Sequence, residues 1–247
     1  MSAIVAIPAR MESSRFPGKV LADINGHPML WHVLQGVATA KKVSAVWVVT
    51  DSVEVQSAVT SWGAQALMTR PDCPSGTARI ASVIDRLEGE TIINVQGDEP
   101  LISGVVIDMV VDALETSGSN VATPIFRISE FEDVFNQNLV KVVRDANGKA
   151  LYFSRSAIPY VRDVEPLDWP SVTPFWGHVG VYAYRRQVLE DFYLLSGSPL
   201  EGAEKLEQLR LIEAGLSIQT VEVKYRSQGV DTPEDLEQVK KVIQGTQ

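Results

Sequence analysis

Three observations predict an α/β fold built on a doubly wound, mostly parallel sheet. Short apolar runs rich in β-branched residues alternate with segments of helical period through the first hundred residues. The runs show no polar alternation, which is typical of parallel strands that are buried on both faces. The chain has 247 residues, 45% of them hydrophobic, and this is enough material for one large core.

The expected strands of this first part are short, mainly apolar runs: 3–7, 44–50, 64–68 and 91–96. Helices are expected between them, over residues 28–40, 52–62 and 77–88. We expect right-handed crossovers between these parallel strands, and in such sheets ligands bind outside the carboxyl ends of the strands. The segments "PARMESSR", "TDS" and "GDEP" follow three of the strands and are therefore expected at those ends.

The pattern changes after residue 120, where the runs predict antiparallel strands. They are "NVATPIFRI", "LVKVVRDANGKALYFSRS" and "HVGVYAYRR", and Asn147-Gly148 in the second is a strong hairpin signal. The proline-rich stretch 160–176 has no clear period, so we expect a loop or an arm at a subunit contact. A helix, a strand and a second helix complete the chain: 203–215, 217–223 and from Thr232 onward.

Composition and charge exclude several classes of protein. The formal charge is −9 and the isoelectric point about 4.9, so no global positive field is present to hold a nucleic acid or an anionic membrane. No apolar run approaches the roughly 18 residues of a membrane span, and a signal-peptide pattern is lacking. Cys73 is the single cysteine, which fits a reducing compartment. We expect one cytoplasmic domain over residues 1–247, with a β-rich insert or dimerisation element near 120–185.

The stretch "IPARMESSRFPGKVL" holds Arg10, Arg15 and Lys19 directly after the first expected strand. Cations and free backbone N–H groups in such a loop would gather around a polyanion such as a phosphate chain. The alternative is three solvated surface cations. Two known phosphate loops are excluded, because Ser13 and Val20 replace the first glycine and the hydroxyl residue of a Walker loop, and no G-x-G-x-x-G is present.

Asp98 and Asp231 lie in motifs that fit either a functional carboxylate or a helix cap. Asp98 in "NVQGDEP" follows a buried strand, where a carboxylate suits Mg²⁺ but could instead cap a helix near Ser103. Asp231 in "GVDTPEDLEQV" precedes Thr232 and Pro233, a pattern typical of a helix start. Spacing alone therefore favours a cap at Asp231.

Several further polar residues have no decisive interpretation from spacing. The motif "CPSGTAR" could offer Ser75, Gly76 and Thr77 to a base or phosphate at a helix start, or could be only a cap. His178 alternates with apolar residues in an expected strand, where a histidine is more often structural than catalytic. The other candidates are Arg155 after a strand and Glu207 and Gln208 beside a helical core stripe.

Taken together, these motifs resemble the 3-deoxy-manno-octulosonate (Kdo) cytidylyltransferase family. The shared segments occur in the family's order along nearly the whole chain. They are "IPARMESSRFPGKVLADINGHPML", "VVTDS", "MTRPDCPSGTAR", "INVQGDEPLI", "NLVKVVRDANGKALYFSRSAIPY", "HVGVYAYRR", "SPLEGAEKLEQLR" and "GVDTPEDLEQV". The resemblance implies an α/β nucleotidyltransferase fold of the GT-A-like type, in a protein that usually dimerises.

The resemblance also implies a reaction, in which CTP and Kdo give CMP-Kdo and pyrophosphate for lipopolysaccharide or capsule synthesis. It implies Mg²⁺ as cofactor, with Asp98 and Asp231 as its ligands and Lys19 as a further catalytic residue. The residues implied for CTP are Arg10, Arg15, Lys19, Ser75, Gly76 and Thr77. The residues implied for the sugar acid are Gln96, Arg155, His178, Tyr182, Glu207 and Gln208.

The chain departs from the usual pattern of this family in three places. Ala78 stands where an acidic residue usually follows "SGT", and Gly177 stands where an arginine usually precedes the histidine. The segment 160–176 is also shorter than usual. These differences lie nearer the expected sugar and dimer elements than the triphosphate loop. Transfer of CMP to a related ulosonic acid, such as an 8-amino analogue of Kdo, is therefore the alternative expectation.

Overall fold

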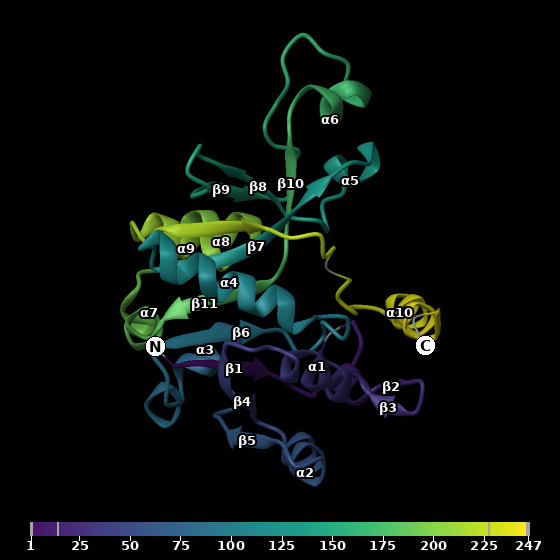
Figure 1. Cartoon of the computed structure of the whole chain (residues 1–247), viewed down its shortest axis with the longest axis vertical. Helices are drawn as coiled ribbons and strands as arrows, with labels where there is room; N and C mark the ends of the chain where they lie inside the picture. The colour runs from purple at the N-terminus through teal and green to yellow at the C-terminus, as the bar shows by residue number, and fades with distance from the viewer. Residues whose placement is uncertain (1, 14, 227, 246–247) are drawn as a thin grey trace.

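The first half of the sheet is parallel, as the apolar runs predict. In the computed structural model, which describes residues 2–13, 15–226 and 228–245, four strands pair in parallel in the order β5-β4-β1-β6. Their bounds are β1 Ala3–Pro8, β4 Val43–Thr50, β5 Gln65–Met68 and β6 Thr91–Val95. Because the strands are parallel, their carboxyl ends meet at one edge of the sheet (Figure 1).

Helices connect these strands and cover both faces of the sheet. Side chains of α1 (Met29–Ala38), α2 (Val53–Ser61) and α4 (Gly104–Ser117) share one buried cluster with β1, and α3 (Gly76–Ala81) contributes to the cluster on the opposite face. The helix predicted over 77–88 is wrong in its length. It ends at Ala81, where the Ser82 hydroxyl donates to the Arg79 carbonyl, and only a 3₁₀ turn follows, at Ile84–Arg86.

The second half of the sheet is antiparallel except for one strand. The order continues from β6 through β11, β7, β10, β8 and β9, and β12 pairs in parallel with β7. The bounds are β7 Val121–Ile128, β8 Lys141–Arg144, β9 Ala150–Ser154, β10 Phe175–His178, β11 Val181–Arg185 and β12 Ile218–Glu222. This mixed sheet with helices on both faces confirms the predicted α/β fold class.

The hairpin predicted at Asn147-Gly148 is confirmed, because β8 and β9 pair across it and Gly148 has φ 80°. The strand predicted in "HVGVYAYRR" is divided, since β10 ends at His178 and β11 begins at Val181. Between β9 and β10 the chain projects from the sheet as an arm (Figure 1). The arm carries a 3₁₀ turn and a short helix: Pro166–Asp168 and α6, Trp169–Val172.

The helix predicted over 203–215 is two short helices, α8 (Pro199–Glu204) and α9 (Gln208–Glu213). Lys205 separates them with φ 56°, a left-handed conformation that stops a helix. The strand and helix predicted after them correspond to β12 and to α10 (Pro233–Gly245). The remaining elements are short: β2 Asp23–Ile24, β3 His27–Pro28, α5 Phe131–Phe135, α7 Arg186–Glu190, and 3₁₀ turns at Lys19–Leu21 and Phe192–Leu194.

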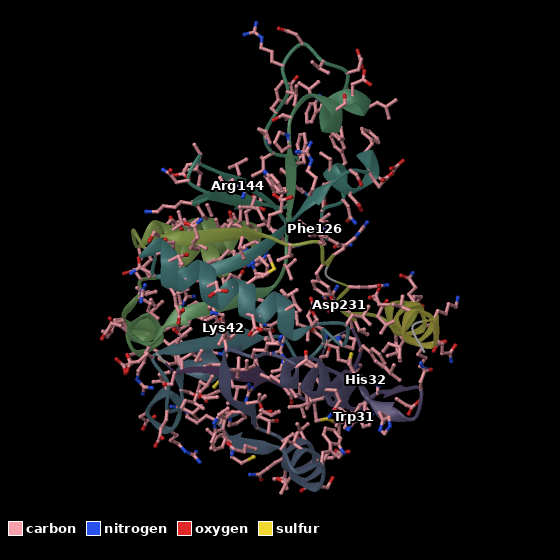
Figure 2. All side chains as sticks on the ribbon, viewed as in Figure 1. Trp31, His32, Lys42, Phe126, Arg144 and Asp231 are labelled. Carbon is pink, nitrogen blue, oxygen red and sulfur yellow. The ribbon has the colours of Figure 1, made fainter. Side chains whose placement is uncertain are left out.

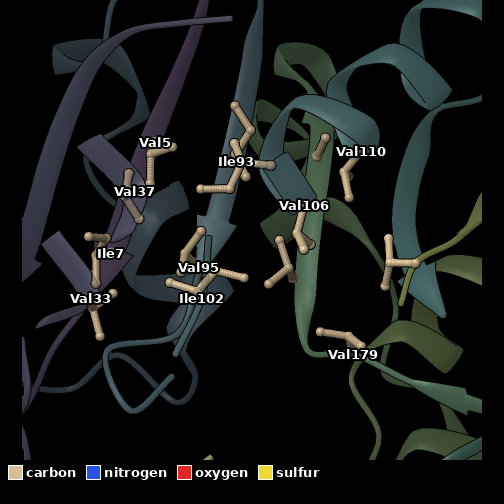
Figure 3. Close-up of a cluster of buried hydrophobic side chains, with 14 of the residues drawn as sticks. Val5, Ile7, Val33, Val37, Ile93, Val95, Ile102, Val106, Val110 and Val179 are labelled. Carbon is tan, nitrogen blue, oxygen red and sulfur yellow. The ribbon is translucent and has the colours of Figure 1, made fainter. Parts of the chain in front are cut away.

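Buried apolar side chains of β1, β6, α1 and α4 pack together and fix the strands whose carboxyl ends form the ligand-binding edge. Figure 3 shows Val5 and Ile7 of β1 packed near Val33 and Val37 of α1, with the side chains of β6 and α4 beside them. Fully burying a side chain of this size stabilises the fold by about 2 kcal/mol. None of the described helices is long and apolar enough to cross a membrane.

Candidate functional site

The candidate site lies at the carboxyl ends of β1 and β6. The loop after β1 turns at Gly18, where φ is 71°, and enters the 3₁₀ turn that carries Lys19. A cavity of about 240 Å³ opens beside this loop. The predicted residues that line it are Arg10, Arg15, Lys19, Ser75, Gly76, Gln96, Asp98 and Asp231. Segments that are distant in the sequence therefore meet at one edge of the sheet.

Lys19 lies between the two candidate metal ligands. Its Nζ donates to Asp98 Oδ2 at 2.5 Å, to Asp231 Oδ1 at 3.0 Å and to the Val230 carbonyl at 3.0 Å. The Lys19 side chain is 12% exposed, and burial alone would lower its pKa, but the two carboxylates raise the pKa above its ordinary value. The ammonium group therefore remains charged at neutral pH and holds both carboxylates around one point.

The two arginines of the loop are more open to solvent. Arg15 Nη2 is 2.8 Å from Asp231 Oδ2, and 61% of the Arg15 side chain is exposed. Arg10 lines the cavity and is also exposed. Such guanidinium groups keep donors available for a polyanion, since an exposed ion pair holds them only weakly. Figure 2 shows Asp231 on the segment that leads into α10.

The structure shows that other residues cap the helix that follows Asp231, and that Asp98 binds a cation. At α10, Thr232 Oγ1 accepts the Asp235 N–H at 3.2 Å, while Asp235 Oδ2 accepts the N–H groups of Asp231 and Thr232 at 3.0 and 2.9 Å. The Asp231 carboxylate binds the cations of the loop instead. Asp98 also binds Lys19, and Ser103 holds the N-cap position of α4 without a capping hydrogen bond from its side chain. The capping interpretation is therefore wrong for both carboxylates.

The segment 75–77 contributes both to the wall of the cavity and to the buried polar residues behind that wall. Ser75 Oγ accepts the Ala78 N–H at 3.1 Å, which caps α3, and the same hydroxyl donates to Glu207. A Cβ on Gly76 would lie 3.0 Å from Pro8 Cγ and 3.4 Å from the Gln96 side-chain oxygen. Glycine therefore lets α3 begin directly against the end of β1.

Hydrogen bonds beneath the cavity connect residues predicted for the nucleotide with residues predicted for the sugar acid. Gln96 Nε2 donates to Asn94 Oδ1 at 3.0 Å, and Asn94 Nδ2 donates to Thr77 Oγ1 at 3.2 Å. Thr77 is 3% exposed, so it belongs to this buried layer rather than to the cavity wall. Burial raises the pKa of Glu207, although hydrogen bonds from Ser75 and Thr77 oppose this shift.

Five of the six residues predicted for the sugar acid do not line the cavity: Glu207, which binds the Ser75 hydroxyl, and four others. His178 is buried, its Nε2 lies 3.0 Å from Thr123 Oγ1, and burial lowers its pKa to about 3. Tyr182 is also buried, with its ring centroid 5.3 Å from that of His178. Arg155 donates to backbone carbonyls near α8 and before β8, and Gln208 is buried in α9. The structure thus brings His178 and Tyr182 together but leaves this group away from the cavity wall.

The cavity also has polar lining residues that sequence reasoning did not assign: Glu12, Ser13 and Arg79. Glu12 and Ser13 belong to the cationic loop after β1. Arg79 follows the "PSGT" motif by two positions, and its partner Asp51 lies in "TDS" at an expected strand end. The sequence therefore contained a signal for Arg79, because both segments were expected at the ligand-binding edge.

The donor set at this edge suits a divalent cation. Among the described residues no three His, Cys, Asp or Glu side chains form a metal-binding group. Asp98 Oδ2 and Asp231 Oδ1 nevertheless converge on one cation, because both lie within 3.0 Å of Lys19 Nζ. Mg²⁺ is commonly bound by one or two carboxylates together with substrate phosphates. The residues present therefore fit a Mg²⁺ ion whose coordination substrate oxygens would complete.

Comparison with known proteins gives a consistent result over the whole chain. A family profile described as cytidylyltransferase matches residues 4–218. The chain is 41% identical to a 3-deoxy-manno-octulosonate cytidylyltransferase of Thermodesulfovibrio yellowstonii, with 98% of each chain covered. It is 46% identical to the protein of that name from Pseudoalteromonas translucida, with 99% of this chain and 98% of the other covered.

Solved structures agree with these relatives. A CMP:2-keto-3-deoxy-manno-octonic acid synthetase complexed with CTP superposes with a TM-score of 0.93 at 41% identity, and all of both chains is covered. A cytidylyltransferase from Leptospira borgpetersenii superposes with a TM-score of 0.65 at 17% identity, over 99% of this chain and 87% of the other. The second comparison shows similarity of fold alone.

Proposed function

Because this chain belongs to the cytidylyltransferase family, we propose that it transfers the cytidylyl group of CTP to Kdo, with release of pyrophosphate. The observation that carries the proposal is the cavity in which Arg10, Arg15 and Lys19 meet Asp98 and Asp231. Cations suit a triphosphate and paired carboxylates suit a divalent cation, so one cavity offers both requirements of nucleotidyl transfer.

The nucleotide would lie along the loop after β1. Arg10 and Arg15 are exposed guanidinium groups that would bind the β- and γ-phosphates, while Lys19 supplies a buried point charge. Ser75 and Gly76 also line the cavity, and there they would contact the cytidine. Thr77 would act from below, because it orients Asn94 and through it Gln96.

Asp98 and Asp231 would hold Mg²⁺, which supplies charge neutralisation at the phosphates and lowers the pKa of the attacking hydroxyl. In the free protein Lys19 Nζ takes the place of that charge between the two carboxylates. Binding of Mg-CTP would release Lys19 from at least one carboxylate, and its ammonium group would then face the phosphate chain. Lys19 is therefore useful in both states, first as a counter-ion and then as a phosphate ligand.

The sugar acid would approach from the side of Gln96. Its anomeric oxygen would form a bond to the α-phosphorus while the bond from that phosphorus to the pyrophosphate oxygen breaks, and the hydroxyl proton would pass to solvent. Gln96 lines the cavity. Glu207 accepts a hydrogen bond from the Ser75 hydroxyl, and Ser75 also lines the cavity. By resemblance to the family we also assign Arg155, His178, Tyr182 and Gln208 to the sugar site. Nothing in the structure favours the 8-amino analogue over Kdo.

We also propose a homodimer in the cytoplasm, with the arm as the dimerisation element. Tyr160, Leu167 and Val172 on the arm are 76%, 69% and 57% exposed, and three large apolar side chains on one projection favour burial against a partner. Cys73 is a free, buried thiol, which fits a reducing compartment.

The test is release of pyrophosphate by the purified protein over a panel of nucleotides and ulosonic acids, with Mg²⁺ present. We expect release with CTP and Kdo, a much lower rate with ATP, GTP or UTP, and none after chelation of the metal by EDTA. Turnover of an 8-amino ulosonate in preference to Kdo would overturn the proposed substrate. Binding of CTP without release for any sugar acid would overturn the proposed activity.

A further inference from the structure

Arg79 is a buried cation at the edge of the nucleotide cavity, separate from the cations of the loop after β1. It lies on α3, four residues after Ser75, and its side chain is 3% exposed. It also lines the cavity. A buried guanidinium group has lost its hydration, so the groups that replace water around it indicate what it holds in place.

The partners of Arg79 are the ends of two neighbouring strands. Nη2 lies 2.8 Å from Asp51 Oδ2, one residue beyond β4. Nη1 donates to the Thr69 hydroxyl and, at 3.3 Å, to the Arg70 carbonyl, and both residues directly follow β5. The planar guanidinium group therefore ties α3 to the carboxyl ends of β4 and β5 at the same time.

These contacts of Arg79 hold in place the segment that carries Ser75 and Gly76. Residues 69–76 run from the end of β5 to the start of α3, and Ser75 and Gly76 within them line the cavity. Arg79 fastens the beginning of the segment through Thr69 and Arg70, while its own helix carries the end. Removing the guanidinium group would free the beginning and leave the Asp51 carboxylate without its buried partner.

We propose that Arg79, held by Asp51, is a positioning residue that sets the shape of segment 69–76 for CTP. The proposal rests on the proposed function, because it deepens the account of the nucleotide site. Arg79 acts through the backbone of this segment, so its loss should weaken CTP binding more than it affects the sugar acid or the chemical step. If a mutation away from the reacting atoms displaces the bound substrate by about 1 Å, activity can fall by up to roughly a hundredfold.

The experiment measures CTP binding by calorimetry in the absence of Kdo, followed by kcat and the KM values for CTP and Kdo. For Arg79→Met we expect the Kd and KM for CTP to rise about tenfold or more, with the KM for Kdo changed less than about twofold. Arg79→Lys should show a smaller loss, because lysine can pair with Asp51 but cannot bind both strand ends through a planar group. Asp51→Asn should weaken CTP binding in the same direction.

Arg86→Met is the matched control. Arg86 also reaches the end of β5, since its Nη1 lies 3.4 Å from the Met68 carbonyl, but it does not line the cavity. We expect its CTP affinity to equal that of the wild type. Combining Arg79→Met with Asp51→Asn should add little to the loss caused by Arg79→Met alone, because both changes break one tie.

Unchanged CTP affinity in folded Arg79→Met would overturn the proposal, and so would equal rises in the KM values for both substrates. A fall in activity that only follows the fraction of folded protein would overturn it too, because Arg79 would then be structural. If Arg79→Met does not fold, the same criteria apply to Arg79→Lys and Asp51→Asn. Failure of the wild-type protein to bind CTP would instead contradict the proposed function, so the two results are distinguishable.

Discussion

Two neighbouring carboxylates, Asp231 and Asp235, have different tasks at the start of α10. Asp235 Oδ2 accepts two backbone N–H groups, while Asp231 pairs with Lys19 and Arg15 at the cavity. We expect Asp231→Asn to lower kcat by at least about a hundredfold with a change in melting temperature of no more than about 2 °C. Steady-state pyrophosphate release and thermal unfolding, measured on the same preparation, check this.

Asp235→Ala is the control for that prediction. It removes the acceptor of the capping pair, so it should cost about 1 kcal/mol in the free energy of unfolding and leave kcat near the wild-type value. A variant Asp231→Asn that unfolds readily but keeps normal specific activity would show that Asp231 is structural.

Lys19 should compete with a divalent cation when no nucleotide is bound. Its Nζ lies within hydrogen-bond distance of both Asp98 and Asp231, so a metal ion must displace a buried ammonium group. We expect Lys19→Met to bind Mn²⁺ about tenfold more tightly than the wild type in the absence of CTP, which corresponds to about 1.4 kcal/mol. Its affinity for CTP should fall. Electron paramagnetic resonance of free Mn²⁺ measures the first effect, and weaker Mn²⁺ binding by the variant would contradict it.

The buried imidazole of His178 should make the protein less stable in acid. Burial lowers its pKa to about 3 in the folded protein, against about 6.5 in the unfolded chain. Between these values only the unfolded chain is protonated, so the stabilisation is complete above pH 6.5 and is lost as pH falls toward 3. From this group we expect a loss of about 2 kcal/mol between pH 7 and 5.

Urea unfolding at pH 7 and 5 tests this contribution. His178→Gln should reduce the difference between the two pH values, whereas His27→Gln, at an exposed site on β3, should leave it as in the wild type. Equal pH dependence in wild type and His178→Gln would show that His178 is not the group responsible.

Residue types and spacing predicted which carboxylates and cations gather, but not which residue performs which task. The motif around Asp231 has the form of a helix start, and only the three-dimensional contacts show that Thr232 and Asp235 make the cap. His178 and Tyr182 lie within one expected strand, which the structure divides into β10 and β11 around Gly180. A glycine inside a strand pattern indicates such a break, but it does not tell which residues near it line a cavity.

At the level of elements, the ring of Phe126 on β7 covers Gly177 on the neighbouring strand β10. A Cβ there would be 2.5 Å from Cζ of Phe126, a residue that is 6% exposed and labelled in Figure 2. This contact is a physical reason for glycine at position 177. We expect Gly177→Ala to lower the free energy of unfolding by about 1–3 kcal/mol. Chemical denaturation measures the change.

The matched control is Gly202→Ala in α8, where a Cβ meets no heavy atom within 4 Å. This change should stabilise the protein by up to about 1 kcal/mol, because alanine favours a helix over glycine. Pairing Gly177→Ala with Phe126→Leu should recover part of the loss by making space. A Gly177→Ala variant as stable as the wild type would mean that the Phe126 ring moves aside freely.

The elements themselves were predicted best where a long periodic run has clear ends. The parallel strands and the hairpin at Asn147-Gly148 agree with the structure. The helices over 77–88 and 203–215 were predicted too long, because Ser82 and Lys205 end them without a glycine or proline at the break. Hydrophobic spacing continues across both breaks, so periodicity alone cannot locate them.

On the scale of the whole molecule, the sequence predicted two kinds of strand but not their order. β11 lies between β6 and β7, and β12 returns from the end of the chain to pair with β7. These pairings depend on long-range packing, which local patterns do not contain. They also explain the site, because the β11–β6 pairing brings Tyr182 opposite Asn94, beneath the cavity.

The arm between β9 and β10 gives the prediction that concerns the assembled protein. Tyr160 and Leu167 expose most of their surface on an element that projects from the sheet, so a partner subunit would bury them (Figure 1). We expect sedimentation velocity to show a species of twice the 27.1 kDa chain mass. The double change Tyr160→Glu and Leu167→Glu should shift it to the monomer, because burying two carboxylates costs more than an apolar contact of this size supplies.

Val53→Glu on α2, where the side chain is 68% exposed, is the control and should leave the dimer unchanged. A double variant that sediments as the wild type would place the subunit contact elsewhere, and the arm would then need another reason for its exposed apolar side chains.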